Sequence, residues 1–497
     1  MSNTGRHHAS SMAISTLNHD VLLNIFNWYR LGNTTGFDRG WNLERWWYKP
    51  IQVCRTWRHL ILASPTRLDL HLVCTHGTPI TTMLTHSPPL PLIIYYPGRL
   101  AAGEEEDVLF ALQHRERVHR IHIRAPAASL PCLLDVMDGE YPVLQRLVIH
   151  SHSEKPCAAS AGTGVQLPTK LQAPLLRRLT LTNVRLPADS ELLRRAESLV
   201  TLELLDIADS LEHHPAHLVA QLARMAQLER LVVHFRTALP NHAVERTLWG
   251  APTTRAALPR LQLLSFRGGS AYLEGVLARI SAPSVQKLFI DFFAQLTFDL
   301  PSLVRFVRAA QPSPEGDGRA IQRSQFHAAE LHFDAETACM LLDSRKTDRA
   351  RPGGARTNPV QLRVSCRALD WQLASLAQIC GALTPLFAHV EGLTLGLHTS
   401  HPKPDANSDC LDSDRAQWHA LLRAFGGTKT LQLGGPHAAH ILHELLPLPA
   451  ELLPALQELL PGDDGEPGAG EDEGGLAAFT AEREATGRPV GVVRDWW

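Results

Sequence analysis

Groups of histidines are the residues in this sequence whose type and spacing come closest to a metal site. His437, His440 and His443 recur at every third position, so a helix would bring them onto nearly one face. Zinc accepts imidazole ligands, but no carboxylate or cysteine completes the set, and no second histidine follows to form an H-E-x-x-H motif. The pattern therefore predicts an exposed histidine face rather than a metal site. The same interpretation applies to a second group, which consists of His213, His214 and His217.

Two short patterns could provide a nucleophile. In the run 268–272, Gly-Gly-Ser-Ala-Tyr, tyrosine stands where a nucleophile elbow needs its second glycine. Cys54 lies beside Arg55 and Arg58, whose charges could make a thiol reactive, but the helical register of this segment predicts that Cys54 points into the core. Asp409, Asp412 and Asp414 could belong to a calcium-binding loop, but their segment lacks the turn glycine and the terminal glutamate of such a loop. We therefore predict a protein that is not an enzyme and has no cofactor.

Composition narrows the partners that the chain could have. The 497 residues carry a net charge of −2, which provides no global basic field for nucleic acid. The eight cysteines are scattered and form no C-x-x-C pair, which indicates reduced thiols in an intracellular protein of the cytoplasm or nucleus. No segment approaches the roughly 18 apolar residues that cross a bilayer, so we expect neither a membrane nor a nucleic acid as partner.

A leucine pattern, L-x-x-L-x-L, returns along most of the chain. Alternate leucines share one side of a short strand, and the stretches between copies, such as 191–196 and 218–226, are typical of helices. One strand and one helix cannot bury their apolar faces alone, whereas stacked neighbours can. The sequence therefore predicts an α/β solenoid of degenerate leucine-rich repeats over residues 67–497, with parallel strands on one face and helices on the other. Clear copies lie at 144–149, 176–181, 199–204, 228–233, 261–266 and 285–290, and weaker ones at 331–333, 390–395 and 431–433.

The segment before the repeats has a different character. After a flexible leader, 1–13, we expect a helical module over 14–66, with a first helix at 14–26 capped by Asp20. A second helical pattern spans 43–62 and is interrupted by Pro50. Nearby tryptophans at 41, 46 and 47 are expected to cover the junction with the first strand. A last helix at 476–486 and a strand at 490–493 should close the chain. Disordered insertions are expected near 311–320, 344–358, 399–414 and 462–475.

The N-terminal module resembles the F-box. The family's opening apolar helix is matched by residues 17–26, Leu-Asn-His-Asp-Val-Leu-Leu-Asn-Ile-Phe, and its Val-Cys-Arg-x-Trp-Arg motif by residues 53–58. Ala-Ser-Pro at 63–65 closes the match, which covers about a tenth of the chain. More narrowly, the chain resembles the F-box proteins with leucine-rich repeats of mushroom-type (basidiomycete) fungi, in Trp-Asn-Leu-Glu-Arg-Trp-Trp-Tyr at 41–48, in 68–77 and in 487–490.

This resemblance implies a non-catalytic adaptor. The helical module would dock onto the linker subunit of a cullin-type ubiquitin ligase, and the repeats would recruit an unknown protein substrate. Asn18 stands where the family has proline, which leaves a second interpretation open: a repeat scaffold with a vestigial F-box and no ligase contact. The residues expected to bind the linker subunit are Leu17, Asp20, Leu22, Leu23, Ile25, Phe26, Val53 and Trp57.

Overall fold

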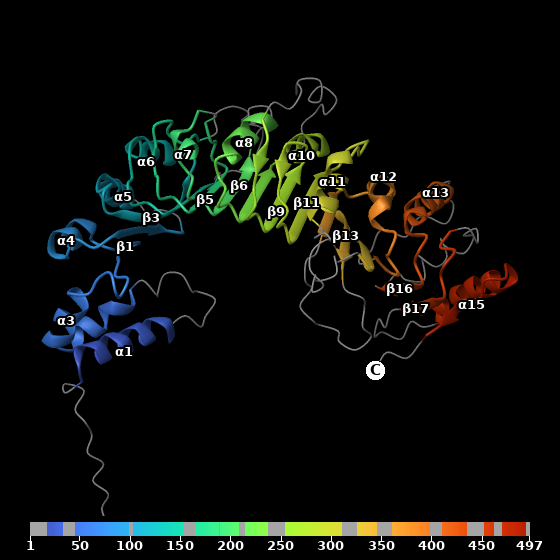
Figure 1. The fold of residues 1–497 in the computed structure, drawn as a ribbon, viewed down its shortest axis with the longest axis horizontal. Helices are drawn as coiled ribbons and strands as arrows, with labels where there is room; N and C mark the ends of the chain where they lie inside the picture. Colours follow the sequence, from blue (N-terminus) through green and yellow to red (C-terminus); the bar gives the residue numbers. More distant parts are fainter. Residues whose placement is uncertain are drawn as a thin grey trace, which may run out of the picture. The chain divides into compact units, whose positions relative to one another are not determined.

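The fold is mixed α/β, with a mostly parallel β-sheet and helices packed against it (Figure 1), as the sequence predicts at this coarse level. The chain forms two compact units: Met1–Ala161 with Leu167–Leu176, and Gly162–Gln166 with Arg177–Trp497. The expected leader, 1–13, and the expected insertion at 311–320 lie outside the described residues. The computed structural model describes residues 17–32, 45–98, 103–152, 165–187, 189–207, 214–236, 254–310, 326–344, 360–397, 410–434, 452–461 and 470–493.

The first unit begins with short helices: α1 (His19–Gly32), η2 (Trp46–Tyr48), α2 (Pro50–Val53) and α3 (Arg55–Leu62). Helix α1 extends further toward the C-terminus than predicted, and its cap is Asn18, whose Oδ1 accepts a hydrogen bond of 3.3 Å from the Asp20 N–H. The prediction that Asp20 is the cap was therefore wrong. Asp20 lies in the first turn, where a carboxylate stabilises the positive end of the helix dipole.

The expected helical pattern from 43 to 62 is interrupted at Pro50, as predicted, where α2 begins after η2, and a second time at Cys54. This residue has extended backbone angles, φ −158° and ψ 168°, and its Sγ accepts a hydrogen bond from the Trp57 N–H at the start of α3. Cys54 is exposed, so the prediction of a core thiol was wrong. The physical reason is that a break in the backbone resets the helical register, and residues on either side no longer share a face.

Four parallel strands follow in the first unit, paired in chain order: β1 (Leu72–Cys74), β2 (Leu92–Tyr96), β3 (Val118–Pro126) and β4 (Arg146–His152). They alternate with α4 (Ile80–His86), α5 (Glu104–Gln113) and α6 (Leu130–Val136), of which α5 and α6 lie over one side of the sheet (Figure 1). The leucine pattern located β4 but not β3. In β3 the same spacing is occupied by valine and isoleucine, at Val118, Ile121 and Ile123.

In the second unit the leucine copies coincide with strands. The first five described strands of its main sheet pair in parallel: β5 (Arg178–Thr182), β6 (Thr201–Ile207), β7 (Arg230–Phe235), β9 (Leu263–Gly268) and β11 (Lys287–Phe293). The connections contain α7 (Glu191–Arg194), α8 (Pro215–Leu222) and α10 (Ser270–Leu277), and α11 (Pro301–Ala310) follows β11. A small separate pair joins β8 (Ala256–Ala257) and β10 (Ile280–Ser281).

One strand of the second unit runs against the others. In chain order β12 (Ala328–Phe333), β13 (Thr337–Asp343) and β14 (Val360–Ser365) follow β11, but the order in the sheet is β11-β14-β13-β12. Strand β13 is antiparallel to both neighbours, while β14 is parallel to β11. The leucine pattern did not predict β13 and β14, because a hairpin return carries no stacked repeat unit.

The sheet of the second unit continues beyond β12 with parallel strands. They are β15 (Gly392–Leu397), β16 (Thr430–Gly434), β17 (Glu458–Pro461) and β18 (Gly491–Val492). In the chain, α12 (Leu369–Leu383) and η3 (Thr384–Leu386) precede β15, α13 (Cys410–Leu422) and η4 (Arg423–Phe425) lie between β15 and β16, and α15 (Gly470–Ala485) lies between β17 and β18. Residues 410–414 and 470–475, which we expected to be disordered, belong to α13 and α15; the parts 345–358, 399–409 and 462–469 lie outside the described residues.

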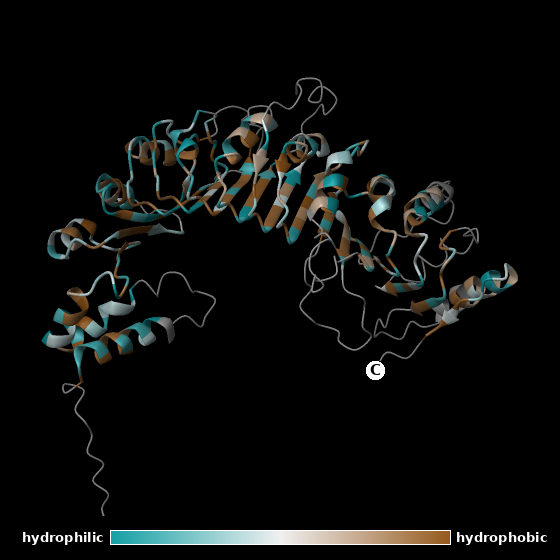
Figure 2. Cartoon of the chain, in the orientation of Figure 1, coloured by the Kyte–Doolittle hydropathy of each residue, from teal (hydrophilic) through white to brown (hydrophobic). Residues whose placement is uncertain are grey.

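The core lies between each sheet and its helices. All three leucines of a typical copy, Leu176, Leu179 and Leu181, are fully buried. Figure 2 shows hydrophobic and hydrophilic residues alternating along the strands of the second unit, so each strand keeps one apolar and one polar side. Among the described residues, no helix combines the length and the apolar character that spanning a bilayer requires.

Candidate docking surface on the helical segment

Helix α1 has one face in the core of the first unit. Leu22, Leu23 and Phe26 are buried, and the Phe26 ring contacts the Trp57 ring edge-on, with 4.9 Å between centroids. Leu60 and Ile61 of α3 are buried as well. A helix only needs to bury one stripe of apolar residues, so this face accounts for the stability of the segment and leaves the opposite face unexplained.

The opposite face of α1 is also apolar. Val21, Ile25, Trp28 and Tyr29 are exposed, with relative exposures of 44 %, 44 %, 74 % and 44 %. Their spacing of four, seven and eight residues places them on one side of the helix. We name these four residues the α1 stripe. A helix with two apolar faces is unusual in water unless the second face has a partner, so the α1 stripe is the candidate docking surface.

The predicted docking residues divide between the two faces. Ile25 belongs to the α1 stripe, and Val53 of α2 is also exposed, at 62 %. Asp20 is exposed and forms an ion pair of 2.9 Å with Arg67, whereas Leu17 and Trp57 are half-buried. The remaining three face the core: Leu22, Leu23 and Phe26.

Sequence reasoning did not single out Val21, Trp28 and Tyr29. The expected first helix ended at residue 26, which cut off Trp28 and Tyr29. The spacing from Val21 to Ile25 and on to Trp28 is a helical signal that could have found them. It was obscured because apolar residues occupy both sides of α1, and the sequence alone does not say which side the core takes.

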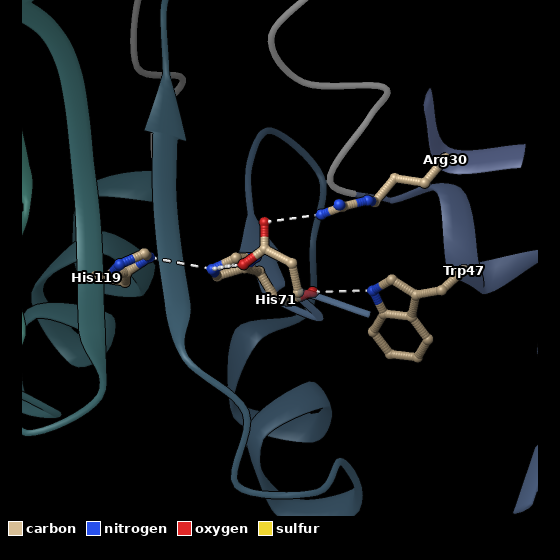
Figure 3. Close-up of polar contacts among 5 residues, drawn as sticks. Arg30, Trp47, His71 and His119 are labelled. Atoms are coloured by element: carbon tan, nitrogen blue, oxygen red, sulfur yellow. Dashed lines mark hydrogen bonds and ion pairs between the residues drawn. The ribbon is translucent and has the colours of Figure 1, made fainter. Parts of the chain in front are cut away.

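Segment 45–48 attaches the helical segment to the sheet by covering the outer edge of β1. The carbonyls of His71 and Val73 point away from β2 and accept hydrogen bonds of 3.2 Å from Trp47 Nε1 and Arg45 Nη2 (Figure 3 draws the first). Trp47 is buried, as is its neighbour Trp46. The prediction that tryptophans here cover the junction with the first strand is confirmed for Trp47. Trp46 instead contacts the Tyr29 ring of α1, and Trp41 lies outside the described residues. Such covering prevents an open strand edge from pairing with another chain.

A pair of histidines lies beside this junction. His71 Nε2 and His119 Nδ1 are 3.0 Å apart in a hydrogen bond, and the two rings are stacked (Figure 3). Asp69 Oδ1 lies 3.7 Å from His71 Nε2, and Asp69 Oδ2 forms an ion pair of 3.2 Å with Arg30 at the end of α1. Burial lowers the pKa of His71 to about 4 despite the opposing attraction of Asp69, and burial also lowers the pKa of His119. Both rings are therefore neutral at neutral pH.

This pair makes the stability of the first unit depend on pH. An unfolded histidine takes up its proton near pH 6.5, whereas folded His71 resists protonation until about pH 4, so the unfolded chain binds more protons in this window. Stability is thus full above pH 6.5 and is lost as the pH falls toward 4. We expect His71 to account for about 2 to 3 kcal/mol of the loss between pH 7 and pH 4.5.

Urea denaturation followed by circular dichroism measures this effect. His71→Gln, which has no titratable ring, should show a smaller fall in unfolding free energy from pH 7 to pH 4.5 than the wild type. Because His119 and other partly buried histidines titrate in both proteins, only the difference between them reports on His71. An identical fall in the two proteins would show that His71 does not resist protonation.

The other residues considered for chemistry have structural roles or lie outside the described residues. His214 caps α8, since its Nδ1 accepts a hydrogen bond of 3.1 Å from the Ala216 N–H. Ser270 is buried and accepts a hydrogen bond from the Gln295 side chain, so it does not face an open site. No group of His, Cys, Asp or Glu side chains suited to a metal occurs in the part of the chain that the structure describes. The group His437, His440 and His443 falls outside that part.

A pocket beside α12 offers little for catalysis. It is bounded by two exposed apolar side chains, Leu296 and Trp371, and by several amide side chains. Asp370 is the one acidic or basic residue among those that line it. A general acid–base mechanism needs positioned proton donors and acceptors, which this lining does not supply.

Comparison with known proteins leaves this description unchanged. No protein-family model matches the chain, and no curated protein matches it either. The candidate surface is therefore defined by its geometry alone. It is the α1 stripe, on a helix whose other face packs in the core and whose segment is attached to the edge of β1 through residues 45–48.

Proposed function

We propose that this chain is a non-catalytic adaptor of a cullin-type ubiquitin ligase. In this proposal the helical segment 17–65 is an F-box that binds the ligase's linker subunit, and the strand–helix units that follow form a leucine-rich-repeat solenoid that recruits a protein for ubiquitylation. The α1 stripe is the observation that carries the proposal. Large apolar residues that remain exposed on a stably packed helix favour a helix-in-groove contact with another protein.

The repeats support the recruiting half of the proposal. In the second unit, helices such as α8, α10 and α11 lie on one side of the sheet (Figure 1), and the other side of its strands carries polar residues. Open faces of stacked strands are the surfaces that repeat proteins use to bind other proteins. An adaptor of this kind makes no bonds itself; it raises the effective concentration of substrate near the catalytic subunits.

Asn18 bears on the alternative of a scaffold without ligase contact. That alternative was favoured by asparagine at the family's proline position. Asn18 caps α1 through its hydrogen bond with the Asp20 N–H, and asparagine is among the best residues for this position. The substitution is therefore compatible with a well-formed docking helix, and it no longer favours the scaffold.

Co-purification from the native cell tests the proposal. The tagged full chain should recover the linker subunit and the cullin, and the Ile25→Asp variant should recover neither while remaining as abundant. Ile25 is suitable because it is exposed, so a charge there does not disturb the core. Absence of the linker subunit from the wild-type preparation would favour the scaffold alternative.

A further inference from the structure

The described strands of the first unit contain no acidic residue. Their sequences are LVC, LIIYY, VHRIHIRAP and RLVIHSH. The strands of the second unit, in contrast, include acidic residues on several of their polar sides, for example Glu203, Asp291 and Glu330. The charged and histidine side chains of the first sheet all come from β3 and β4: His119, Arg120, His122, Arg124, Arg146, His150 and His152.

Most of these side chains share one side of the sheet. Alternation in β3 buries Ile121 and Ile123 toward the helices and leaves Arg120, His122 and Arg124 on the other side. In β4 the same alternation buries Leu147 and Ile149 and leaves Arg146 and His150 opposite them. The register pairs Arg120 with Arg146 and Arg124 with His150. We name Arg120, His122, Arg124, Arg146 and His150 the basic face.

The centre of the basic face is a set of contacting rings. The His122 ring lies 5.2 Å from the Tyr95 ring of β2 and 5.5 Å from the His150 ring of β4. Burial, together with the charges of His150 and Arg146, lowers the pKa of His122 to about 4. The neighbours that act on His122 therefore create a positive potential at this point, in agreement with the strand sequences. Arg124 is exposed at one end and forms no ion pair with any described residue.

We infer that the basic face binds an extended, carboxylate-rich segment of a protein partner. This inference deepens the proposed recruiting function, and rests on it, by giving the recruited protein a chemistry. Arg120 and Arg124 are separated by about 13 Å along β3, at roughly 3.3 Å per residue. In an extended chain with acidic residues at alternate positions, neighbouring carboxylates are about 6.6 Å apart, so carboxylates four residues apart match the distance from Arg120 to Arg124. Guanidinium groups bind carboxylates with charge-assisted hydrogen bonds.

The spread of positive charge favours several carboxylates over a single concentrated anion. The arginines stand at both ends of the face and do not converge on one point, as they would around a phosphate. Nucleic acid is less favourable, because it extends beyond this face and the chain, with a net charge of −2, provides no wider basic field to bind the rest of a polyanion. A short acidic peptide experiences only the local potential, since charges beyond about 8 Å are screened at physiological ionic strength.

Fluorescence anisotropy of the purified full chain tests the inference. The probe is a labelled peptide with glutamate at alternate positions, and the control peptide has lysine in place of glutamate. We expect saturable binding of the glutamate peptide only, weakened by added NaCl. Arg124→Glu should raise the Kd about tenfold, because it replaces an attraction with a repulsion. Arg363→Glu is the matched control: Arg363 is an exposed arginine on a strand of the second unit, and its reversal should leave the Kd within about twofold.

Each outcome decides the inference. Binding of the glutamate peptide that is weakened by Arg124→Glu and preserved in Arg124→Lys supports it. No binding, or an equal loss in Arg363→Glu, overturns it. Tighter binding of a single-stranded RNA of equal charge, lost in Arg124→Glu, would assign the face to nucleic acid instead. The linker subunit is absent from this assay, so its result is independent of whether the α1 stripe docks onto a ligase.

Discussion

The Ile25→Asp variant is expected to bind the linker subunit at least about 100-fold more weakly than the wild type while keeping its fold. Ile25 lies in the middle of the α1 stripe, between Val21 and Trp28. A central apolar anchor in a helix-in-groove contact is typically a hot spot, and a buried unpaired carboxylate adds a desolvation cost to the loss of packing, so the sum exceeds about 2.7 kcal/mol, which is 100-fold in Kd. Isothermal titration calorimetry with purified linker subunit measures the change.

Two further variants make this result interpretable. Leu296→Asp places the same charge on a side chain of the second unit that is also exposed, and it should bind the linker subunit as the wild type does. Leu22→Asp is unsuitable, because Leu22 is buried and its loss of binding could follow from unfolding. If Ile25→Asp binds normally, the docking surface is not the α1 stripe.

The Phe26→Ala variant is expected to lose about 3 to 5 kcal/mol of stability in the helical segment, the cost of truncating a large buried aromatic side chain. Phe26 is almost fully buried and contacts Trp57, so the truncation removes a main contact between α1 and α3. Native-state hydrogen exchange of the amides in α1 and α3 measures the loss, because it reports on the opening of this segment separately from the rest of the chain.

Trp28→Ala is the matched control for Phe26→Ala. It removes an aromatic side chain from the same helix two residues away, but Trp28 is 74 % exposed, so hydrogen exchange should change little. The same variant should weaken binding of the linker subunit. Equal destabilisation by both substitutions would mean that the described orientation of α1 is wrong, and the α1 stripe would then not be available to a partner.

Much of the fold could be predicted from the leucine spacing. Each copy, such as 176–181 or 261–266, ends in a strand whose leucines are buried, because the alternation that defines the pattern is also what one-sided burial requires. Strand β3 was missed because β-branched residues replace leucine there. Strands β13 and β14 could not be predicted, since their antiparallel return depends on pairing between distant strands and not on a local repeat.

Less of the candidate site could be predicted. The prediction continued the helical spacing through Cys54, where the backbone is in fact extended. It therefore placed the Cys54 thiol in the core, although this thiol is exposed. Apolar residues on both sides of α1 made its buried face ambiguous: Phe26 and Ile25 are adjacent in sequence, but Phe26 is buried and Ile25 is exposed. The face of α1 that packs in the core is determined by contacts with α3 and with the edge of β1. Those elements are distant in sequence, so the local pattern of α1 does not reveal the contacts. The basic face was also missed, because it is formed by the register of two strands.

Hydrogen–deuterium exchange of the full chain, with and without saturating linker subunit, shows whether α1 docks onto this partner. We predict that added linker subunit protects peptides from α1 and α2, residues 19–32 and 50–53, and leaves exchange in strands β5 to β11 unchanged. Protection confined to the strands, or no protection in a chain whose α1 is demonstrably folded, would contradict it.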